Sequence, residues 1–232
     1  MTGLIVLAGG GEFEKGYETA DRFALEQAGG PEAPVVIVPT AGGADGGIPM
    51  ASRNGVNWFR QLGGRNVEAL PLATRQDANK SEIVQQLEKA RLVYMAGGSP
   101  AYLLEALKGS AAWEAMQEAL NSGAIVGGSS AGAMVLAQYM YNPSTGEVIP
   151  ALGLLPNTLF IPHFNTFGRK WVDKIQAALP DVLIIGVDEK VAIIGRGNDW
   201  QVYGRGWITL YRKGKPAKYQ GGQPFKFDYQ GN

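Results

Sequence analysis

The sequence contains no cysteine among its 232 residues. This absence excludes disulfides, thiolate nucleophiles and cysteine zinc sites together, and it fits a reducing compartment. No apolar run approaches the roughly 18 residues that a membrane-spanning helix needs. The first residues also lack the basic segment and the apolar length of a signal peptide. We therefore expect a cytoplasmic protein with no membrane partner.

Neither sign of charge is in excess, because 21 Lys and Arg residues balance 21 Asp and Glu residues. We therefore expect no broad basic face for nucleic acid. The sequence has no H-E-x-x-H motif and no clustered metal-ligand spacing. Residues 9–12, Gly-Gly-Gly-Glu, match neither the dinucleotide-binding nor the P-loop pattern. These observations predict a protein with no metal and no cofactor.

Glycine, in contrast, is abundant at 33 residues, about twice its usual share of ~7%. Glycine and proline bound short apolar runs that alternate with amphipathic stretches. The runs are continuous, as in parallel strands that are covered on both faces. They are Leu4–Ala8, Pro34–Pro39, Leu92–Ala96, Ala124–Gly127, Thr158–Pro162 and Val182–Val187. The stretches with helical spacing are Tyr17–Ala28, Ile48–Leu62, Ser81–Ala90, Ala101–Leu107, Ala111–Asn121 and Arg169–Leu179.

This alternation predicts an α/β fold with a mostly parallel, doubly wound sheet and helices on both faces. The chain changes character near Glu189. Beyond it, Val191–Gly195, Gln201–Tyr203 and Trp207–Arg212 are expected to form antiparallel hairpin strands. No linker and no internal repeat is apparent, so we expect residues 1–232 to form a single domain. Ligands should bind beyond the carboxyl ends of the parallel strands.

Residues 128–132, Gly-Ser-Ser-Ala-Gly, match the G-x-S-x-G nucleophile elbow. The apolar run before them predicts a strand, and Met134–Ala137 after them is expected to continue as a helix. A sharp strand-to-helix turn leaves room only for small flanking residues. It also places Ser130 beside the free N–H groups of a helix start, which can stabilise an oxyanion. The alternative is a simple loop in which Ser129 or Ser130 caps the helix. Gly97-Gly98, at the end of the preceding strand, favours the nucleophile by offering a second backbone donor.

His163 directly follows the apolar run Thr158–Pro162, where a sheet of this kind places its site. A lone histidine is more often a surface or core residue, but this position favours a functional one. A neutral imidazole there would accept the Ser130 proton and return it to the leaving group.

A third residue should orient the imidazole. Asp188 and Glu189 follow the next strand, and only one of them can serve, because adjacent side chains point to opposite faces. We prefer Glu189, with Asp188 as the alternative. The order Ser, His, acid differs from the Ser, acid, His order of the α/β-hydrolase fold, which counts against an ordinary lipase or esterase.

These motifs together resemble the family of alpha-aspartyl dipeptidase (peptidase E) and cyanophycinase. The resemblance rests on Gly-Ser-Ser-Ala-Gly-Ala at 128–133, Gly97-Gly98, His163-Phe164 and Gly-Val-Asp-Glu at 186–189. It implies a class I glutamine-amidotransferase-like fold. It also implies that Ser130 is the nucleophile, His163 the base and Glu189 the acid.

The resemblance further implies oxyanion donors at the backbone of Gly98 and Ala131. The substrate-reading positions depart from the family pattern. Ser99-Pro100 stands where the family carries an amide or acid pair, and Thr166-Phe167 replaces the Gln-Arg of cyanophycinase, whereas Arg169 is kept. Ser99, Asn165, Thr166 and Arg169 are the substrate-binding candidates. Arg53 and Arg205 are weaker carboxylate clamps.

The leading hypothesis is a serine peptidase, monomeric or homodimeric, that cleaves an amide bond in a small peptide. The resemblance alone favours an acidic, Asp-containing one. Two alternatives remain open. One is a catalytically inactive relative that binds a ligand at the same site, and the other is an esterase for small acyl groups.

Overall fold

The computed structural model describes residues 2–227 and contains two sheets within that range. The eight-stranded sheet runs in the spatial order β14 (Pro224–Lys226), β11 (Asp199–Gly204), β10 (Val191–Arg196), β1 (Ile5–Ala8), β5 (Ile125–Ser129), β4 (Leu92–Met95), β2 (Val35–Val38) and β3 (Val67–Ala69). The six-stranded sheet runs in the order β13 (Lys215–Gln220), β12 (Trp207–Arg212), β9 (Leu183–Val187), β8 (Leu155–Ile161), β6 (Ala137–Asn142) and β7 (Glu147–Pro150).

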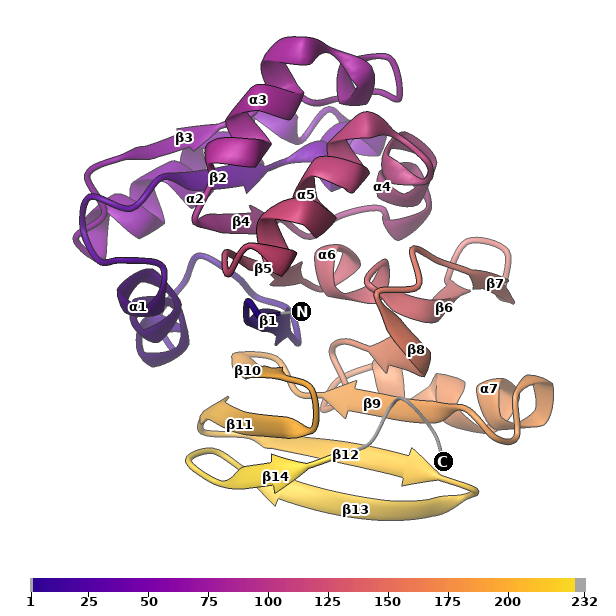
Figure 1. The fold of residues 1–232 in the computed structure, drawn as a ribbon. Coiled ribbons are helices and arrows are strands. Elements are labelled where there is room, and N and C mark those ends of the chain that lie inside the picture. Colours follow the sequence, from indigo (N-terminus) through magenta and orange to yellow (C-terminus); the bar gives the residue numbers. More distant parts are fainter. Residues whose placement is uncertain (1, 228–232) are drawn as a thin grey trace.

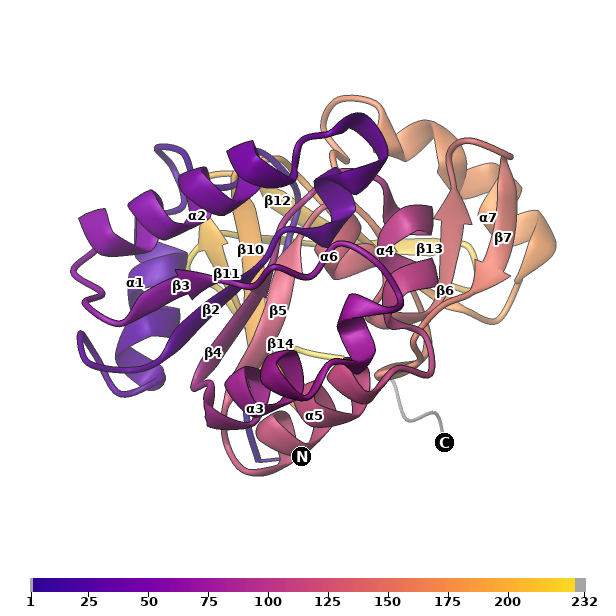
Figure 2. The ribbon, with the colours of Figure 1, turned by 90° about the horizontal axis from the view of Figure 1, so that it is seen from above.

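The helices connect and cover these strands (Figure 1). They are α1 (Glu18–Gln27), α2 (Ile48–Gln61), α3 (Ser81–Lys89), α4 (Pro100–Leu107), α5 (Ala111–Asn121), α6 (Ala131–Met134) and α7 (Val172–Ala178). Seen from above, α1 and α2 lie on one side of β2, β4 and β5, and α3 and α5 lie on the other side (Figure 2). The central strands are thus covered on both faces, which explains their continuous apolar sequences.

Parallel pairing joins β3, β2, β4, β5 and β1 in the first sheet and β6, β8 and β9 in the second. The predicted α/β class with a mostly parallel core and covering helices is therefore confirmed. Antiparallel pairing joins β6 to β7 and all the strands that follow β9, where β10 and β11 extend the first sheet, and β12 and β13 extend the second. The predicted C-terminal hairpins are present, but they are divided between the two sheets.

Three apolar clusters fill the spaces between these layers. One lies between α1, α2 and the first sheet, around Val6, Ile37 and Phe59. The largest lies on the opposite face of that sheet and joins it to α3, α5 and the inner face of the second sheet. The third, with Ile161 and Val172, packs α7 on the outer face of the second sheet. The two sheets therefore share one core, and the carboxyl ends of β5, β8 and β9 are brought close together.

The predicted helical continuation through Met134–Ala137 is wrong. The helix α6 ends at Met134, and β6 begins at Ala137. The reason is tertiary: the carbonyls of Val135, Leu136 and Ala137 accept hydrogen bonds from amides in the segment 152–155, so they are not available for a longer helix. Five strands were also not predicted, namely β3, β6, β7, β13 and β14.

The helices α1 and α2 are joined by a buried polar contact. The Trp58 indole Nε1–H donates to Asp21 Oδ2 at 2.7 Å, and Asp21 is only 1% exposed. Burial raises the pKa of Asp21 to about 7, an effect larger than the opposing one of the Trp58 hydrogen bond. The native protein therefore holds a proton that the unfolded chain releases near the ordinary carboxyl pKa.

This proton makes a sign-specific prediction about stability. Between about pH 4 and pH 7 the native state binds more protons than the unfolded state, so the free energy of unfolding should fall as pH rises, by at most about 1.4 kcal/mol per pH unit from this group. Asp21→Asn keeps an acceptor for Trp58 but cannot ionise. Its stability relative to wild type should therefore increase from pH 5 to pH 8 in urea unfolding. The exposed Asp45→Asn variant should run parallel to wild type, and a parallel Asp21→Asn curve would contradict the prediction.

Candidate active site

Ser130 lies in a sharp turn between β5 and α6. Its backbone has φ 48° and ψ −110°, an uncommon region for a residue with a side chain. A Cβ at Gly128 or at Gly132 would collide with the Met95 carbonyl, so both flanking positions require glycine. Ser130 occupies the N-cap position of α6, but its hydroxyl makes no capping hydrogen bond. The hydroxyl is therefore available for another partner.

That partner is His163, which follows β8 and also has a positive φ of 51°. Its Nε2 lies 3.0 Å from Ser130 Oγ. Ser130 follows β5 of the eight-stranded sheet and His163 follows β8 of the six-stranded sheet, so this contact joins the two sheets. The sequence-based pairing of Ser130 with the one histidine is thus matched by hydrogen-bond geometry.

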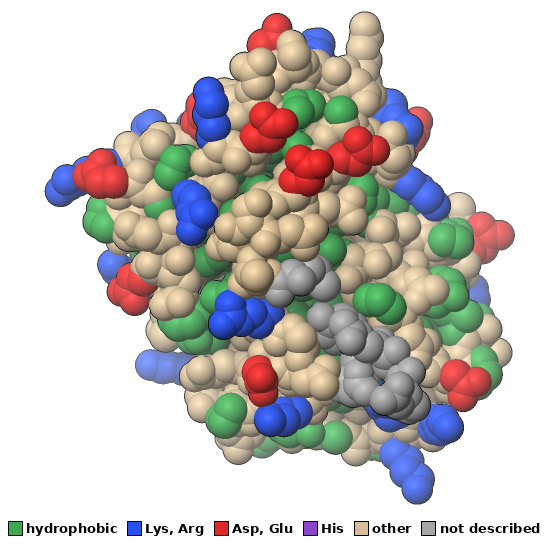
Figure 3. Space-filling view, in the orientation of Figure 1, with side chains coloured by type: hydrophobic (Ala, Val, Ile, Leu, Met, Phe, Trp, Pro, Cys, Tyr) green, Lys and Arg blue, Asp and Glu red, His purple; other side chains and the backbone are tan. Residues whose placement is uncertain are grey.

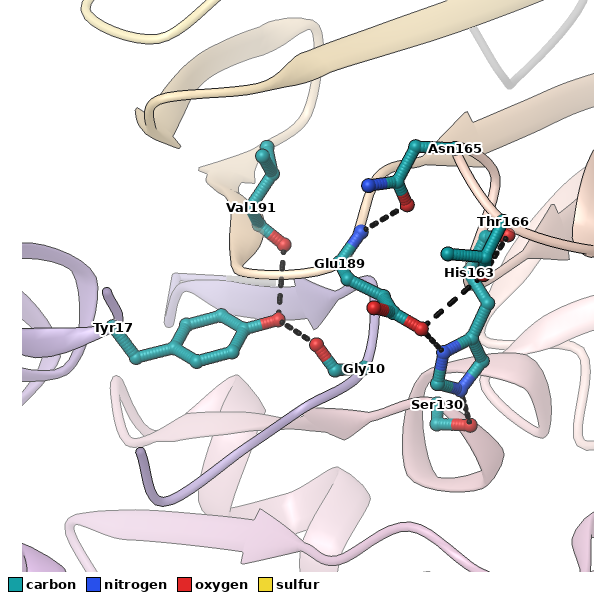
Figure 4. A network of polar contacts seen from close by, with 8 residues as sticks. All are labelled: Gly10, Tyr17, Ser130, His163, Asn165, Thr166, Glu189 and Val191. Atoms are coloured by element: carbon teal, nitrogen blue, oxygen red, sulfur yellow. Dashed lines mark hydrogen bonds and ion pairs between the residues drawn. The ribbon is translucent and has the colours of Figure 1, made fainter. Parts of the chain in front are cut away.

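On its other side, His163 Nδ1 lies 2.7 Å from Glu189 Oε1 (Figure 4). Glu189 is itself held twice by the loop after His163. The Asn165 amide oxygen accepts the Glu189 backbone N–H at 2.9 Å, and the Thr166 hydroxyl donates to Glu189 Oε1 at 3.2 Å. Ser130, His163 and Glu189 therefore form one hydrogen-bonded chain, in which Glu189 selects the tautomer that leaves Nε2 free to accept.

Asp188, the alternative acid, points elsewhere. Its Oδ2 accepts the Trp207 backbone N–H at 2.9 Å, and burial raises its carboxyl pKa. Asp188 therefore supports β12, whereas Glu189, in the turn that follows β9, contacts the histidine.

The imidazole of His163 is enclosed on both faces. A Cβ at Gly10, which has a φ of +109°, would collide with the imidazole. The Phe167 ring stacks on the imidazole with centroids 4.8 Å apart and planes at 21°. This enclosure restricts rotation of the imidazole about its side-chain torsions. Phe167 is also 43% exposed, so its ring reaches the surface beside the site.

The two expected oxyanion donors lie on either side of Ser130. Ala131 begins α6, and Gly98 follows β4 with a φ of +139°, where an added Cβ would collide with the Ala41 carbonyl. Within residues 2–227 neither backbone N–H has a hydrogen-bond acceptor. Both groups are therefore free to bind a substrate oxygen.

The segment 8–10, at the end of β1, has a role in the site that was not predicted from the sequence. Three successive carbonyls in it accept backbone N–H groups from the site: Ala8 from Ser130 at 3.0 Å, Gly9 from His163 at 2.7 Å and Gly10 from Lys190 at 3.0 Å. The Tyr17 hydroxyl in turn donates to the Gly10 carbonyl at 3.0 Å (Figure 4). The available signal was a run of three glycines at the carboxyl end of a buried strand.

The four predicted substrate-binding residues are not all placed alike. The Ser99 hydroxyl caps α4 by accepting the Tyr102 N–H at 3.3 Å. Asn165 and Thr166 contact Glu189, as described above. Together with Arg169 they line a pocket of about 260 Å³ that also includes Asp188 and Lys218. Ser130 does not line this pocket, which lies on the Glu189 side of the site.

Other site types find no support among the described residues. Across residues 2–227 no group of three or more His, Asp or Glu side chains could hold a metal ion. Helices in that range also lack the combined length and apolar character that a membrane crossing requires. Acidic and basic side chains are interspersed on the face in Figure 3, with no continuous basic patch on that face.

Comparison with known proteins agrees with this geometry. The family model for peptidase family S51 matches residues 4–203. The chain is 28% identical to a cyanophycinase of a Nostoc species, covering 90% of this chain and 73% of the relative, and 29% identical to a cyanophycinase of Synechococcus elongatus, covering 90% and 67%.

Among solved structures, a peptidase from an acI-B1 actinobacterium superposes with a TM-score of 0.86 at 30% identity, covering 98% of both chains. The family match spans most of the chain and includes Ser130, His163 and Glu189. The chain therefore belongs to peptidase family S51, a family of serine peptidases.

Proposed function

We propose that this serine peptidase cleaves an amide bond in a small peptide, with Ser130 as nucleophile, His163 as general base and acid, and Glu189 as the residue that orients His163. The observation that carries the proposal is the chain of contacts at 3.0 Å and 2.7 Å through the imidazole. We further propose a cytoplasmic protein that acts as a monomer or homodimer, in keeping with its lack of cysteine.

The proposed reaction has two halves. Ser130 Oγ attacks the carbonyl carbon while His163 Nε2 takes the hydroxyl proton, and Glu189 stabilises the resulting imidazolium. The N–H groups of Gly98 and Ala131 bind the oxyanion. The C–N bond then breaks as His163 protonates the leaving amine. A water molecule hydrolyses the acyl-enzyme by the same proton transfers and restores Ser130.

The geometry supports this reaction over a non-catalytic ligand-binding role. A relative that had lost activity would have no need to keep Ser130 in a strained backbone conformation with its hydroxyl free of a cap. Backbone strain of this kind costs about 1–3 kcal/mol and tends to persist where it serves function. The esterase alternative shares the same chemistry and would lose support if dipeptides were cleaved and activated esters were not.

Three residues of the substrate-reading region lead to two further proposals. Asn165 and Thr166 form hydrogen bonds with Glu189, so we propose that they hold Glu189 in position as well as bind the substrate. Arg169 is the residue we propose to bind a substrate carboxylate, because its pocket opens beside the loop that follows His163 and carries a second cation, Lys218. This proposal retains an acidic, Asp-containing peptide as the substrate to be tested.

The nucleophile is tested by Ser130→Ala. In wild type, a fluorophosphonate should form an Oγ–P bond at Ser130, with loss of fluoride and transfer of the proton to His163. The variant should show neither labelling nor peptide hydrolysis. Labelled protein is detected by mass spectrometry, and undiminished labelling of Ser130→Ala would exclude Ser130 as the nucleophile. Ser129→Ala, which alters the buried neighbouring serine, should still be labelled.

The orienting acid is tested by two matched amides at adjacent positions. Glu189→Gln should lower kcat by about 10²–10⁴-fold, the range for a disabled general base, with little change in KM. Asp188→Asn keeps an acceptor for the Trp207 N–H and should stay within a few-fold of wild type. The reverse pattern in steady-state kinetics would assign the role to Asp188.

The carboxylate proposal is tested with a dipeptide panel, with and without N-terminal Asp. Arg169→Ala should raise KM for acidic dipeptides by about tenfold, since a hydrogen bond to a charged group contributes about 1.5–3 kcal/mol, and should leave neutral dipeptides nearly unaffected. Arg65→Ala removes an exposed cation that pairs with Glu32 and is the charge-matched control. An equal rise in KM for both classes would rule out carboxylate recognition by Arg169.

A further inference from the structure

The segment 96–99, which joins β4 to α4, passes directly beside Ser130. A Cβ at Gly97 would lie 3.3 Å from Ser130 Cβ. Most amides of this segment are tied by hydrogen bonds: the Ala96 N–H to the Val38 carbonyl at 3.0 Å and the Ser99 N–H to the Ala41 carbonyl at 2.8 Å. Among the four amides of this segment, only the Gly98 N–H has no acceptor within residues 2–227. The segment is thus held at both ends around one free donor.

The Gly97 amide is held by a side chain from a distant part of the chain. Glu12, in the loop between β1 and α1, accepts the Gly97 N–H through Oε1 at 2.6 Å. This distance is short for an N–H···O bond and suits an ionised acceptor. Glu12 is partly buried, and a Cβ at Gly97 would lie 2.6 Å from the same Oε1. The carboxylate therefore packs against the segment as well as bonding to it.

Such a restraint has a physical purpose here. Gly97 and Gly98 have no Cβ atoms to limit their backbone torsions, and glycine populates many conformations. Gly98 itself adopts a φ of +139°. An oxyanion donor is effective only when it is aimed before the reaction at the position where charge develops. The Glu12 bond fixes the peptide plane between Ala96 and Gly97, and the Gly98 N–H belongs to the next plane along the chain. Because the Ser99 N–H is also bound, the short segment between these two restrained amides has few ways to turn the Gly98 N–H.

Charge and geometry make opposite contributions at this position. A negative carboxylate near a developing oxyanion raises the energy of the transition state through Coulomb repulsion. A favourable contribution from Glu12 must therefore come from its geometry. Variants that shorten the side chain and variants that remove only its charge should therefore have different effects on catalysis.

We propose that Glu12 is a positioning residue for the reaction: it acts through the Gly97 amide to aim the Gly98 N–H at the oxyanion. The inference rests on the proposed function, in which Gly98 is an oxyanion donor. Glu12 does not contact the reacting atoms, and its effect should appear in kcat, because the oxyanion exists only in the transition state and intermediate.

The test uses variants that separate reach from charge. Glu12→Gln keeps an oxygen at the same reach and should retain kcat within about threefold of wild type. Glu12→Asp keeps the charge but is one methylene shorter, and Glu12→Ala removes the acceptor. Both should lower kcat by about 10–100-fold, somewhat less than deletion of a donor, with KM within about threefold. Glu14→Ala is the matched control, because Glu14 lies in the same loop, is exposed and contacts Lys190 at 3.5 Å.

All kcat values are normalised to the fraction of active sites, measured by exhaustive fluorophosphonate labelling, so that misfolding does not imitate the effect. A rise in KM at constant kcat would make Glu12 a substrate-binding residue and would overturn the proposal. Equal losses in Glu12→Gln and Glu12→Asp would also overturn it, because reach would then be irrelevant.

The rate of labelling separates this proposal from the proposed function. The phosphoryl oxygen occupies the oxyanion position, so Glu12→Ala and Glu12→Asp should be labelled about 10–100-fold more slowly than wild type. If wild type is labelled at Ser130 and the Glu12 variants react at the same rate, the Glu12 proposal alone fails. If wild type is not labelled and cleaves no peptide, the proposed function fails and the Glu12 proposal fails with it.

Discussion

The hydrogen bonds from the end of β1 are the constraint on which the rest of the site depends. The carbonyls of Ala8, Gly9 and Gly10 accept the N–H groups of Ser130, His163 and Lys190 in succession. These three amides belong to three loops that follow β5, β8 and β9 and come from two different sheets. Because consecutive carbonyls have fixed spacing along one backbone, the relative positions of the proposed nucleophile, base and acid depend on a single short segment. Glycine is required at Gly10, whose missing Cβ makes space for the imidazole.

The same loop also reaches the segment that carries the candidate oxyanion donor Gly98, because the Glu12 side chain accepts the Gly97 N–H. Buried polar contacts in turn support the loop: the Tyr17 hydroxyl donates to Gly10, and the neighbouring helix α1 is joined to α2 by Asp21 and Trp58. The candidate catalytic chain and the candidate oxyanion donor are therefore not independent. A disturbance of the β1–α1 loop should reach both, whereas the Arg169 pocket lies on the far side of Glu189 and should be less sensitive.

Strained backbone accompanies this arrangement. Ser130, His163 and Lys190 are three of the six described residues other than glycine that have a positive φ. Such conformations persist only where surrounding structure holds them, and here each of the three amides is held by a β1-end carbonyl. The departures from the cyanophycinase pattern fit into the same frame. Thr166 donates to Glu189, and Phe167 stacks on His163, so both altered positions contact the proposed catalytic side chains directly.

The sequence alone predicted the α/β class, most of the buried strands and helices, and the candidates Ser130, His163 and Glu189. It could do so because buried parallel strands have continuous apolar sequences, the elbow needs small residues at fixed spacing, and one histidine leaves no choice of base. The tertiary structure was needed to establish how the strands divide between two sheets. It was also needed to show that α6 ends after one turn, because the carbonyls after Met134 accept hydrogen bonds from residues 152–155. It also distinguished Glu189 from Asp188 as the partner of His163. The contact between Glu12 and Gly97 joins residues 85 positions apart, and no local pattern in the sequence encodes so distant a pairing.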